Sequence, residues 1–254
     1  MKKLLAILMF VPALAGSGAI ASEAGVALDR APINVRDTAS LQAGARSFVN
    51  YCLNCHSASL VRYNRLRDIG LSEDQIRENL LFTADKVGEM MNSGMTRKDG
   101  KDWFGAAPPD LSVVARSRGA DWLYTYLRGF YRDTETVTGW NNVVFDKVAM
   151  PHVLWNLQGE RVRKVETMKD TDGKDVSDGH GGVRKVVKFE TVKPGSMSAA
   201  EYDVFSRDLV NFMSWMGEPN QVLRKQIGFW VLLVLVVLIG LTWLLKSAYW
   251  KDVH

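Results

Sequence analysis

Apolar residues recur at three- and four-residue steps along much of the chain, a spacing that is typical of amphipathic helices. Helices are predicted over residues 41–55, from 73 toward 82, over 121–130, and from 199 to a point before Pro219. Two of them begin at a capping box, Ser72 to Gln75 and Ser198 to Glu201, which satisfies free amides of the first turn. The last helix carries Tyr202, Phe205 and Phe212 on one face, which we expect to pack on the 41–55 helix. The chain is therefore predicted to be mainly α-helical.

One region departs from this helical pattern and predicts a β-hairpin inserted at about residues 159–194. Charged and β-branched stretches, Arg161 to Met168 and Val183 to Val192, flank the run Asp178-Gly179-His180-Gly181-Gly182. A glycine-rich turn between two such stretches is typical of a hairpin. The hairpin could serve as a solvent-exposed flap or as a docking surface for a partner, and both alternatives stay open.

The most apolar segment lies near the C-terminus and predicts a transmembrane helix. Ile227 to Leu245 contains 19 residues without a charge. At about 1.5 Å per residue it covers roughly 28 Å, close to the hydrocarbon thickness of a bilayer. Basic and aromatic residues lie near both of its ends, as at membrane interfaces; they are Arg224, Lys225, Trp230, Trp243, Lys246, Tyr249, Trp250 and Lys251. A buried core helix is the alternative, but a segment apolar on every face would need a large protein around it.

A shorter apolar segment at the N-terminus predicts an export signal over residues 1–21. Lys2 and Lys3 precede the apolar run Leu4 to Ala15, and Ala19-Ile20-Ala21 is an A-x-A cleavage site. An uncleaved anchor is the alternative, but the run is short for a bilayer span. With the signal removed, we expect residues 22–226 to form a periplasmic domain, residues 227–245 to cross the inner membrane, and the tail 246–254 to lie in the cytoplasm.

The net charge of +4 and the pI of about 9.0 do not describe the exported part of the chain, which excludes the signal and the tail. The signal and the tail together account for three of the four positive charges, which leaves the exported part at +1. A surface so nearly neutral is not suited to polyanions, so nucleic acid is excluded as a partner. The exported part is long enough for a domain with a hydrophobic core.

Both cysteines of the chain lie in the run Cys52-Leu53-Asn54-Cys55-His56, which is the attachment signature of a c-type haem. If the run is helical, both thiols and His56 lie on one face and can reach one porphyrin and its iron. A zinc site lacks partners, because the other histidines stand alone in the sequence. A dithiol redox pair would not need the adjacent histidine, and no βαβ pattern surrounds the run. Two unrelated structural cysteines are the third alternative.

The second axial ligand would decide the role of the haem, because two strong ligands favour electron transfer and an open site favours ligand binding or peroxidase chemistry. Met150 is the leading candidate, since it lies in a predicted loop and Pro151 fixes the backbone just after it. Met95 and His152 remain alternatives. The other central methionines are expected to pack in the core, with Met90 and Met91 at the end of a helical segment and Met213 and Met216 on the last helix of the domain.

Beyond the haem motif, several segments point to one family. They are Phe48 to Cys52, Arg62-Tyr63-Asn64, the run Trp103 to Ser112 with its Pro-Pro-Asp-Leu-Ser end, and Asn211 to Trp215 followed by Glu218-Pro219. Together with the single C-terminal anchor, they resemble cytochrome c1, the haem subunit of ubiquinol-cytochrome c oxidoreductase, over essentially the whole chain. The haem motif is common to all c-type cytochromes, whereas the Pro-Pro-Asp-Leu-Ser segment is far more specific.

The resemblance implies a cytochrome c-like haem domain with loop and β-hairpin insertions and one covalently bound haem c. Cys52 and Cys55 then match the thioether positions, His56 matches the proximal iron ligand, and Met150 matches the distal one. A methionine ligand raises the reduction potential relative to a second histidine.

Three further residues receive roles from the resemblance alone. Arg116 is similar to the arginine that pairs with a haem propionate, and Pro108 and Pro109 are similar to residues that wall the haem pocket. A rigid backbone there would exclude water and help to keep the potential high. Some relatives carry an extra disulfide near the methionine loop, and this chain has no cysteines for it. Its loop is therefore expected to be held by packing.

The function implied by the resemblance is outer-sphere electron transfer within a respiratory cytochrome bc1 complex. One electron would pass from the Rieske iron-sulfur subunit to the chain and on to cytochrome c, while quinol chemistry belongs to the cytochrome b subunit. The chain would then be no enzyme by itself, but a subunit of a dimeric translocase complex in contact with membrane lipid. The alternatives are a membrane-anchored c-type subunit of another oxidase or dehydrogenase, and a haem enzyme with an open sixth site.

Overall fold

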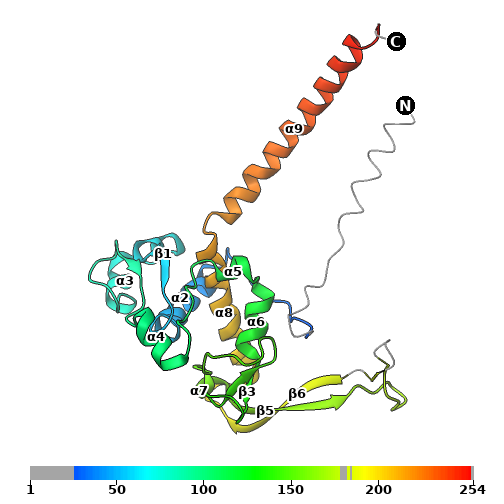
Figure 1. Ribbon diagram of the computed structural model, residues 1–254. Helices are drawn as coiled ribbons and strands as arrows, with labels where there is room; N and C mark the ends of the chain where they lie inside the picture. The colour runs from blue at the N-terminus through cyan, green and yellow to red at the C-terminus, as the bar shows by residue number, and fades with distance from the viewer. Residues whose placement is uncertain (1–25, 178–181, 184, 253–254) are drawn as a thin grey trace. The chain divides into compact units, whose positions relative to one another are not determined.

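The computed structural model describes residues 26–177, 182–183 and 185–252 of the chain. The predicted signal peptide, residues 178–181 and 184 of the predicted hairpin, and residues 253–254 at the end of the predicted tail lie outside the described residues. The chain divides into two compact units (Figure 1). We call Met1–Ala31 with Asp121–Asp203 the methionine unit, and Pro32–Ala120 with Val204–His254 the cysteine unit.

The methionine unit combines two helices with two antiparallel strand pairs. Its elements are α6 (Ala120–Arg128), β3 (Phe130–Arg132), β4 (Trp140–Asn142), α7 (Trp155–Gln158), β5 (Gly159–Thr167) and β6 (Lys185–Pro194), followed by the first turn of α8 (Ala199–Gly217). The predicted helix 121–130 is confirmed, although it ends at Arg128 because Phe130 already pairs with Asn142 in the β3–β4 ladder. Buried aromatic and β-branched residues form the core, among them Phe130, Trp140 and Val148.

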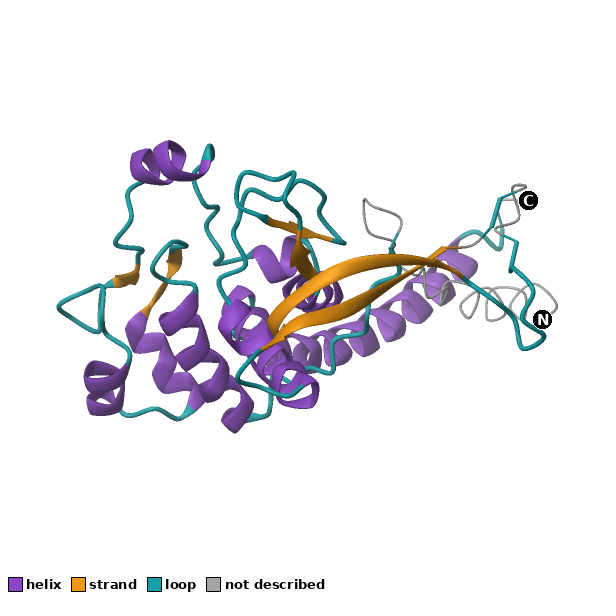
Figure 2. Cartoon of the chain, turned by 90° about the horizontal axis from the view of Figure 1, so that it is seen from below, coloured by secondary structure: helices purple, strands orange, loops and turns teal. Residues whose placement is uncertain are grey.

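The predicted hairpin is confirmed, with ends at the predicted bounds. Strands β5 and β6 pair antiparallel from Gly159 opposite Pro194 to Thr167 opposite Lys185, and Figure 2 shows them as a long twisted ribbon. Cross-strand ion pairs link Lys188 to Glu166 at 2.6 Å and Lys164 to Glu190. Their charged side chains are more than half exposed or close to it, so these pairs contribute to register more than to stability.

The cysteine unit contains most of the helices. Its elements are α2 (Thr38–Tyr51), β1 (Ala58–Arg62), the 3₁₀ helix η2 (Tyr63–Ile69), α3 (Glu73–Asn79), β2 (Met90–Met91), α4 (Arg97–Phe104), α5 (Val114–Ser117), the remainder of α8, and α9 (Gln221–Tyr249). Both predicted capping boxes form: Ser72 and Gln75 bond reciprocally at the start of α3, and Ser198 and Glu201 do so at the start of α8.

Three local expectations for this unit were wrong. The helix predicted over 41–55 begins earlier, because the Asp37 carboxylate accepts a hydrogen bond from the Ser40 amide at 3.1 Å, and it ends at Tyr51. The helix predicted to reach residue 82 ends at Asn79. Met90 and Met91 form strand β2 rather than a helix end, because they pair with β1, although Met91 is buried as expected.

Helices α2 and α8 pack closely, as predicted from the aromatic face of α8. A side chain at Gly44 would overlap the Asp208 carbonyl oxygen of α8 and come within 2.6 Å of Phe212 Cβ. The Phe48 and Phe212 rings lie 5.6 Å apart beside this contact. Ser40 Oγ donates to the Asp208 carboxylate at 2.6 Å across the same interface. Because α2 ends one residue before Cys52, this packing fixes where the haem motif begins.

Helix α9 contains the predicted span 227–245 and extends it at both ends. It has 29 residues, and none of its most apolar stretch is buried against the rest of the protein. Of the described part of the chain, this is the one helix long and apolar enough to cross a membrane.

Candidate haem site

The haem motif forms a tight turn directly after α2. The amides of Cys55 and His56 both donate to the Cys52 carbonyl oxygen, at 3.1 and 2.8 Å. Helix-like hydrogen bonding therefore continues through the motif, as expected for residues that must face one porphyrin. Neither cysteine is in a disulfide. Burial, reinforced by the neighbouring Cys55, raises the pKa of the Cys52 thiol to about 12, so this sulfur is not a thiolate at neutral pH.

His56 is held in one tautomer by a backbone carbonyl. Its side chain is buried, and its Nδ1 lies 2.8 Å from the Pro109 carbonyl oxygen. Because a carbonyl only accepts, Nδ1 carries the proton and the lone pair resides on Nε2. Burial lowers the pKa of His56, and the Pro109 carbonyl and Asp110 offset part of that shift. A neutral imidazole with its Nε2 lone pair available, next to two free thiols, fits a covalently bound haem.

The Pro-Pro-Asp-Leu-Ser segment is tied to the residues that follow the haem motif. The Leu111 amide donates to the Ser57 carbonyl at 2.8 Å, and the Asp110 carboxylate accepts from the amide and hydroxyl of Ser59. Ser112 Oγ, which is buried, accepts from the Leu60 amide at 3.0 Å. Burial alone would raise the pKa of Asp110, but hydrogen bonds from Ser112 and Ser59 bring it below its ordinary value.

The three residues that only the resemblance assigned all lie in the cysteine unit. Pro108 packs on α4, where a side chain at Gly100 would come within 2.6 Å of Pro108 Cδ. Pro109 is exposed, and its carbonyl holds His56. Arg116 is an exposed residue of α5 whose side chain lies along Gly217 at the end of α8.

Met150 belongs to the methionine unit, in a loop held by packing and hydrogen bonds. Its thioether sulfur accepts a hydrogen bond from the Tyr126 hydroxyl at 3.4 Å, and its side chain packs against the core cluster of that unit. The Asn141 side chain donates to Asp133 and to Asp146, each at 2.9 Å, and accepts from the Lys147 amide at 2.9 Å, which fixes the start of the loop before Met150. No disulfide is needed, as expected.

The other candidate ligands differ sharply from Met150. His152 is 2% exposed, stacks on Phe130 with ring centroids 4.6 Å apart, and has its pKa lowered by burial to about 3. It is therefore a neutral core residue. Met95 is half-buried beside Gly100 in the cysteine unit and stays an alternative. Met213 and Met216 are buried on α8, as predicted.

Two site contacts were missed from the sequence. Nothing in the sequence marked the Tyr126 hydroxyl as a partner of Met150 or the Pro109 carbonyl as the partner of His56. A tyrosine at helical spacing and a proline carbonyl carry no local signal for such contacts. Among the described residues, no group of three His, Cys, Asp or Glu side chains is arranged so that it could hold a metal ion.

The fold and the Cys52–His56 turn define a single-haem c-type cytochrome with a C-terminal membrane anchor. A sequence model of the Cytochrome C1 family matches residues 29–178 and 185–253. The chain is 45% identical over 242 residues to cytochrome c1 of Allochromatium vinosum, covering 95% of this chain and 96% of that protein. It is 28% identical over 265 residues to cytochrome c1 of Rhodospirillum rubrum, covering 94% and 93%.

A further relative bears a different name. The chain is 49% identical over 253 residues to a Nitrosomonas europaea protein called "Ammonia monooxygenase gamma subunit", covering 100% of this chain and 98% of that protein. The family match spans nearly all of the described residues.

The chain belongs to the cytochrome c1 family. As a member it carries one covalently bound haem c and is the electron-transfer subunit of a cytochrome bc1 complex, together with cytochrome b and the Rieske protein. Helix α9 anchors it in the membrane. The family and the fold class predicted from the sequence are confirmed.

Proposed function

We propose that Cys52 and Cys55 form the thioether bonds of the haem and that His56 and Met150 are its axial iron ligands. When bound, the haem supplies a one-electron couple. The chain's own residues would then have three tasks: to supply the ligands of the iron through His56 and Met150, to exclude water, and to present docking surfaces.

The observation that carries the assignment is the hydrogen bond between His56 and the Pro109 carbonyl. This hydrogen bond fixes the orientation of the His56 ring and keeps the proton on Nδ1. The lone pair of Nε2 then lies on the side of the ring that faces away from the Pro109 carbonyl. A hydrogen bond of this kind also makes the imidazole a stronger donor to a metal. Both thiols lie in the same turn as the histidine.

The case for Met150 rests on its loop. The sulfur is held by Tyr126, and the backbone around it is fixed by Pro151 and by the Asn141 hydrogen bonds. A thioether ligand stabilises the reduced iron relative to a second imidazole and thus raises the potential. The competing His152 stacks on Phe130 and meets the Trp140 ring edge to face, so it would have to leave the core to bind a metal.

Arg116, Pro108 and Pro109 would complete the pocket. Arg116 is exposed and forms no ion pair with a described acidic side chain, although Glu218 interacts with it electrostatically, so its guanidinium can donate hydrogen bonds to a propionate carboxylate. Pro108 and Pro109 would form a wall with few backbone donors, since proline has no amide hydrogen. Pro109 also has the more particular task of orienting His56.

In the assembled complex we expect the haem domain to face the periplasm and the tail 246–254 to lie in the cytoplasm. The predicted signal peptide supports this orientation, because export of the N-terminus leaves the short tail behind. Cytochrome c is the proposed acceptor, the complex is proposed to be a dimer, and the whole assembly is proposed to act as a quinol-cytochrome c oxidoreductase and translocase. The chain itself makes and breaks no substrate bond.

Gentle detergent purification of the full-length chain from its own membranes tests the assembly. We expect a b-type cytochrome and a Rieske protein to co-purify, and the purified material to reduce cytochrome c with a quinol. Monooxygenase subunits in their place would support the function named for the Nitrosomonas relative and would overturn the proposal. Near-infrared magnetic circular dichroism of the same sample, in the ferric state, reports whether a thioether binds the iron.

A further inference from the structure

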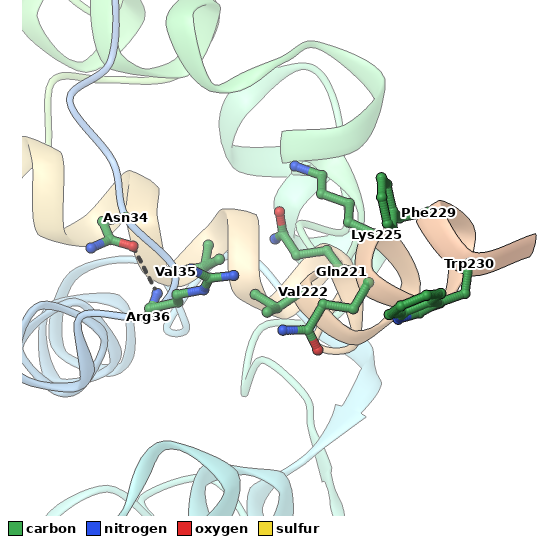
Figure 3. Close-up of a pocket in the computed structure, with 9 residues that line it drawn as sticks. Asn34, Val35, Arg36, Gln221, Val222, Lys225, Phe229 and Trp230 are labelled. Carbon is green, nitrogen blue, oxygen red and sulfur yellow. Dashed lines mark hydrogen bonds between the residues drawn. The ribbon is translucent and has the colours of Figure 1, made fainter. Parts of the chain in front are cut away.

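The cysteine unit has a cavity at the start of α9 that the haem site does not use. Its volume is about 490 Å³, and it lies between the segment before α2 and the first turns of α9 (Figure 3). Five of the lining residues share one face of α9, at three- and four-residue steps; they are Val222, Lys225, Gln226, Phe229 and Trp230. Asn34, Val35, Arg36 and Gln221 complete the lining.

Both walls of the cavity are tied to the same helix, α8. The Asn34 carbonyl accepts hydrogen bonds from the buried Asn211 side chain and from the Asp37 amide, each at 2.9 Å. On the other wall, the Gln221 side chain donates to the Ser214 carbonyl at 3.4 Å. The Arg224 guanidinium binds both carboxylate oxygens of Glu218 just after α8. The cavity is thus a built feature rather than a chance gap between loops.

The cavity is cationic and has no counter-charge of its own. Arg36 and Lys225 line it, and none of the nine lining residues is acidic. Figure 3 shows the Arg36 side chain extending from the 34–36 segment toward α9. The nearby Glu218 already binds Arg224, and Asp37 caps α2. Among the described residues, neither Arg36 nor Lys225 lies within ion-pair distance of an acidic side chain, although Glu218, which binds Arg224, also interacts electrostatically with Lys225.

The other end of the cavity is apolar and continues into the membrane span. The Phe229 and Trp230 rings lie 5.6 Å apart, edge to face, and both side chains are more than 60% exposed. They fall within the first turn of the uncharged segment 227–245. Aromatic side chains at such a position lie at the level of the lipid headgroups. The cavity therefore joins two cations to an apolar surface at the membrane boundary.

We propose that this cavity binds one anionic phospholipid, with its phosphate between Arg36 and Lys225 and an acyl chain along Phe229 and Trp230. A lipid of this kind satisfies both ends of the cavity at once, whereas an apolar helix of a partner would leave both cations buried and unpaired. Basic residues near a membrane surface attract anionic lipids. The inference depends on α9 being a membrane span and not on the haem ligands.

The test uses the full-length haem protein in detergent micelles, titrated with phosphatidylglycerol or phosphatidylcholine that carries brominated chains. Bromine quenches nearby tryptophan, and the quenching that is lost in Trp230→Phe reports this site. The test variant is the double substitution Arg36→Gln with Lys225→Gln. Its matched control is Lys246→Gln with Lys251→Gln, which removes the same charge beyond the other end of the apolar segment. Unchanged haem absorbance and midpoint potential verify the fold of each variant and keep the haem assignment a separate question.

We expect the wild type and the control to prefer phosphatidylglycerol over phosphatidylcholine. Each basic residue should contribute roughly fivefold, so the test variant should lose roughly 25-fold in preference. Equal affinity of the wild type for both lipids, or an equal loss in the control, would overturn the proposal. Native mass spectrometry of the assembled complex supplies the last check: phosphatidylglycerol should be retained by the wild type and lost in the test variant. A complex that retains none shows that a partner subunit covers the cavity, and the proposal is then wrong.

Discussion

The contact between α2 and α8 at Gly44 offers a quantitative test of how the haem motif is positioned. In Gly44→Ala the added methyl group would overlap the Asp208 carbonyl oxygen and lie 2.6 Å from Phe212 Cβ, where ordinary contacts need more than 3.4 Å. The obstacle is helix backbone, which cannot rotate away as a side chain can. The two helices must therefore separate by about an ångström or more.

The cost can be assembled from three effects. Overpacking a well-packed interface costs about 1–3 kcal/mol. Separation would also weaken the 2.6 Å hydrogen bond from Ser40 to the Asp208 carboxylate, and a hydrogen bond to a charged group contributes about 1.5–3 kcal/mol. Alanine is favoured over glycine within a helix by about 1 kcal/mol. We expect a net loss of roughly 2–5 kcal/mol in the free energy of unfolding.

The assay is urea unfolding of the full-length haem protein in detergent, followed by haem absorbance and far-ultraviolet circular dichroism. Gly228→Ala is the control, because it makes the same chemical change in a helix where nothing lies within 4 Å of the new methyl group. The control should leave the midpoint unchanged or raise it slightly, because alanine is favoured over glycine within a helix. A Gly44→Ala variant within about 0.5 kcal/mol of the wild type would refute the close packing of α2 on α8.

Three further predictions concern the site. Met150→Leu should lower the midpoint potential by on the order of 0.1 V with the haem still covalently attached. Met95→Leu should leave the potential unchanged. A redox titration that shows the reverse would make Met95, and not Met150, the iron ligand. Ser112→Ala should cost about 1–2 kcal/mol, because it removes the buried acceptor of the Leu60 amide, whereas the exposed Ser117→Ala should cost less than about 0.5 kcal/mol by the same urea assay. Because the pKa of Asp110 is lowered by folding, its carboxylate stabilises the fold above about pH 4 and loses this effect as the pH falls through the folded pKa. Asp110→Asn should therefore flatten the acid limb of the stability curve, and an unchanged limb would contradict its hydrogen bonds.

Local signals in the sequence were sufficient for the helices and the anchor. Both capping boxes form as predicted, since a serine hydroxyl and an acidic or amide side chain three residues later need no distant partner. The hairpin bounds at Gly159 and Pro194 were also predictable, because alternation and turn residues are local. The apolar segment 227–245 was the strongest signal of all, and α9 contains it.

Long-range pairing could not be predicted in the same way. Strand β2 has two residues, and it exists only because β1, some thirty positions earlier, offers a partner. The tautomer of His56 depends on a carbonyl 53 positions away. The sulfur of Met150 meets a hydroxyl 24 positions earlier in the chain. The ligand residue types could be chosen by chemistry, but their supports arise only when the chain is folded.

The Pro-Pro-Asp-Leu-Ser segment is a more specific mark of the cytochrome c1 family than the haem motif, because its residues make several different contacts at once. Pro108 packs against the bare backbone at Gly100, and the Pro109 carbonyl orients His56. The last three residues bind the segment 57–60 through the Asp110 carboxylate, the Leu111 amide and the Ser112 hydroxyl. These contacts hold the carbonyl of Pro109 at a fixed distance from a histidine that lies one residue before that segment. A haem motif can attach a porphyrin on many scaffolds, whereas in this chain the contacts of the Pro-Pro-Asp-Leu-Ser segment also fix the orientation of the His56 ring.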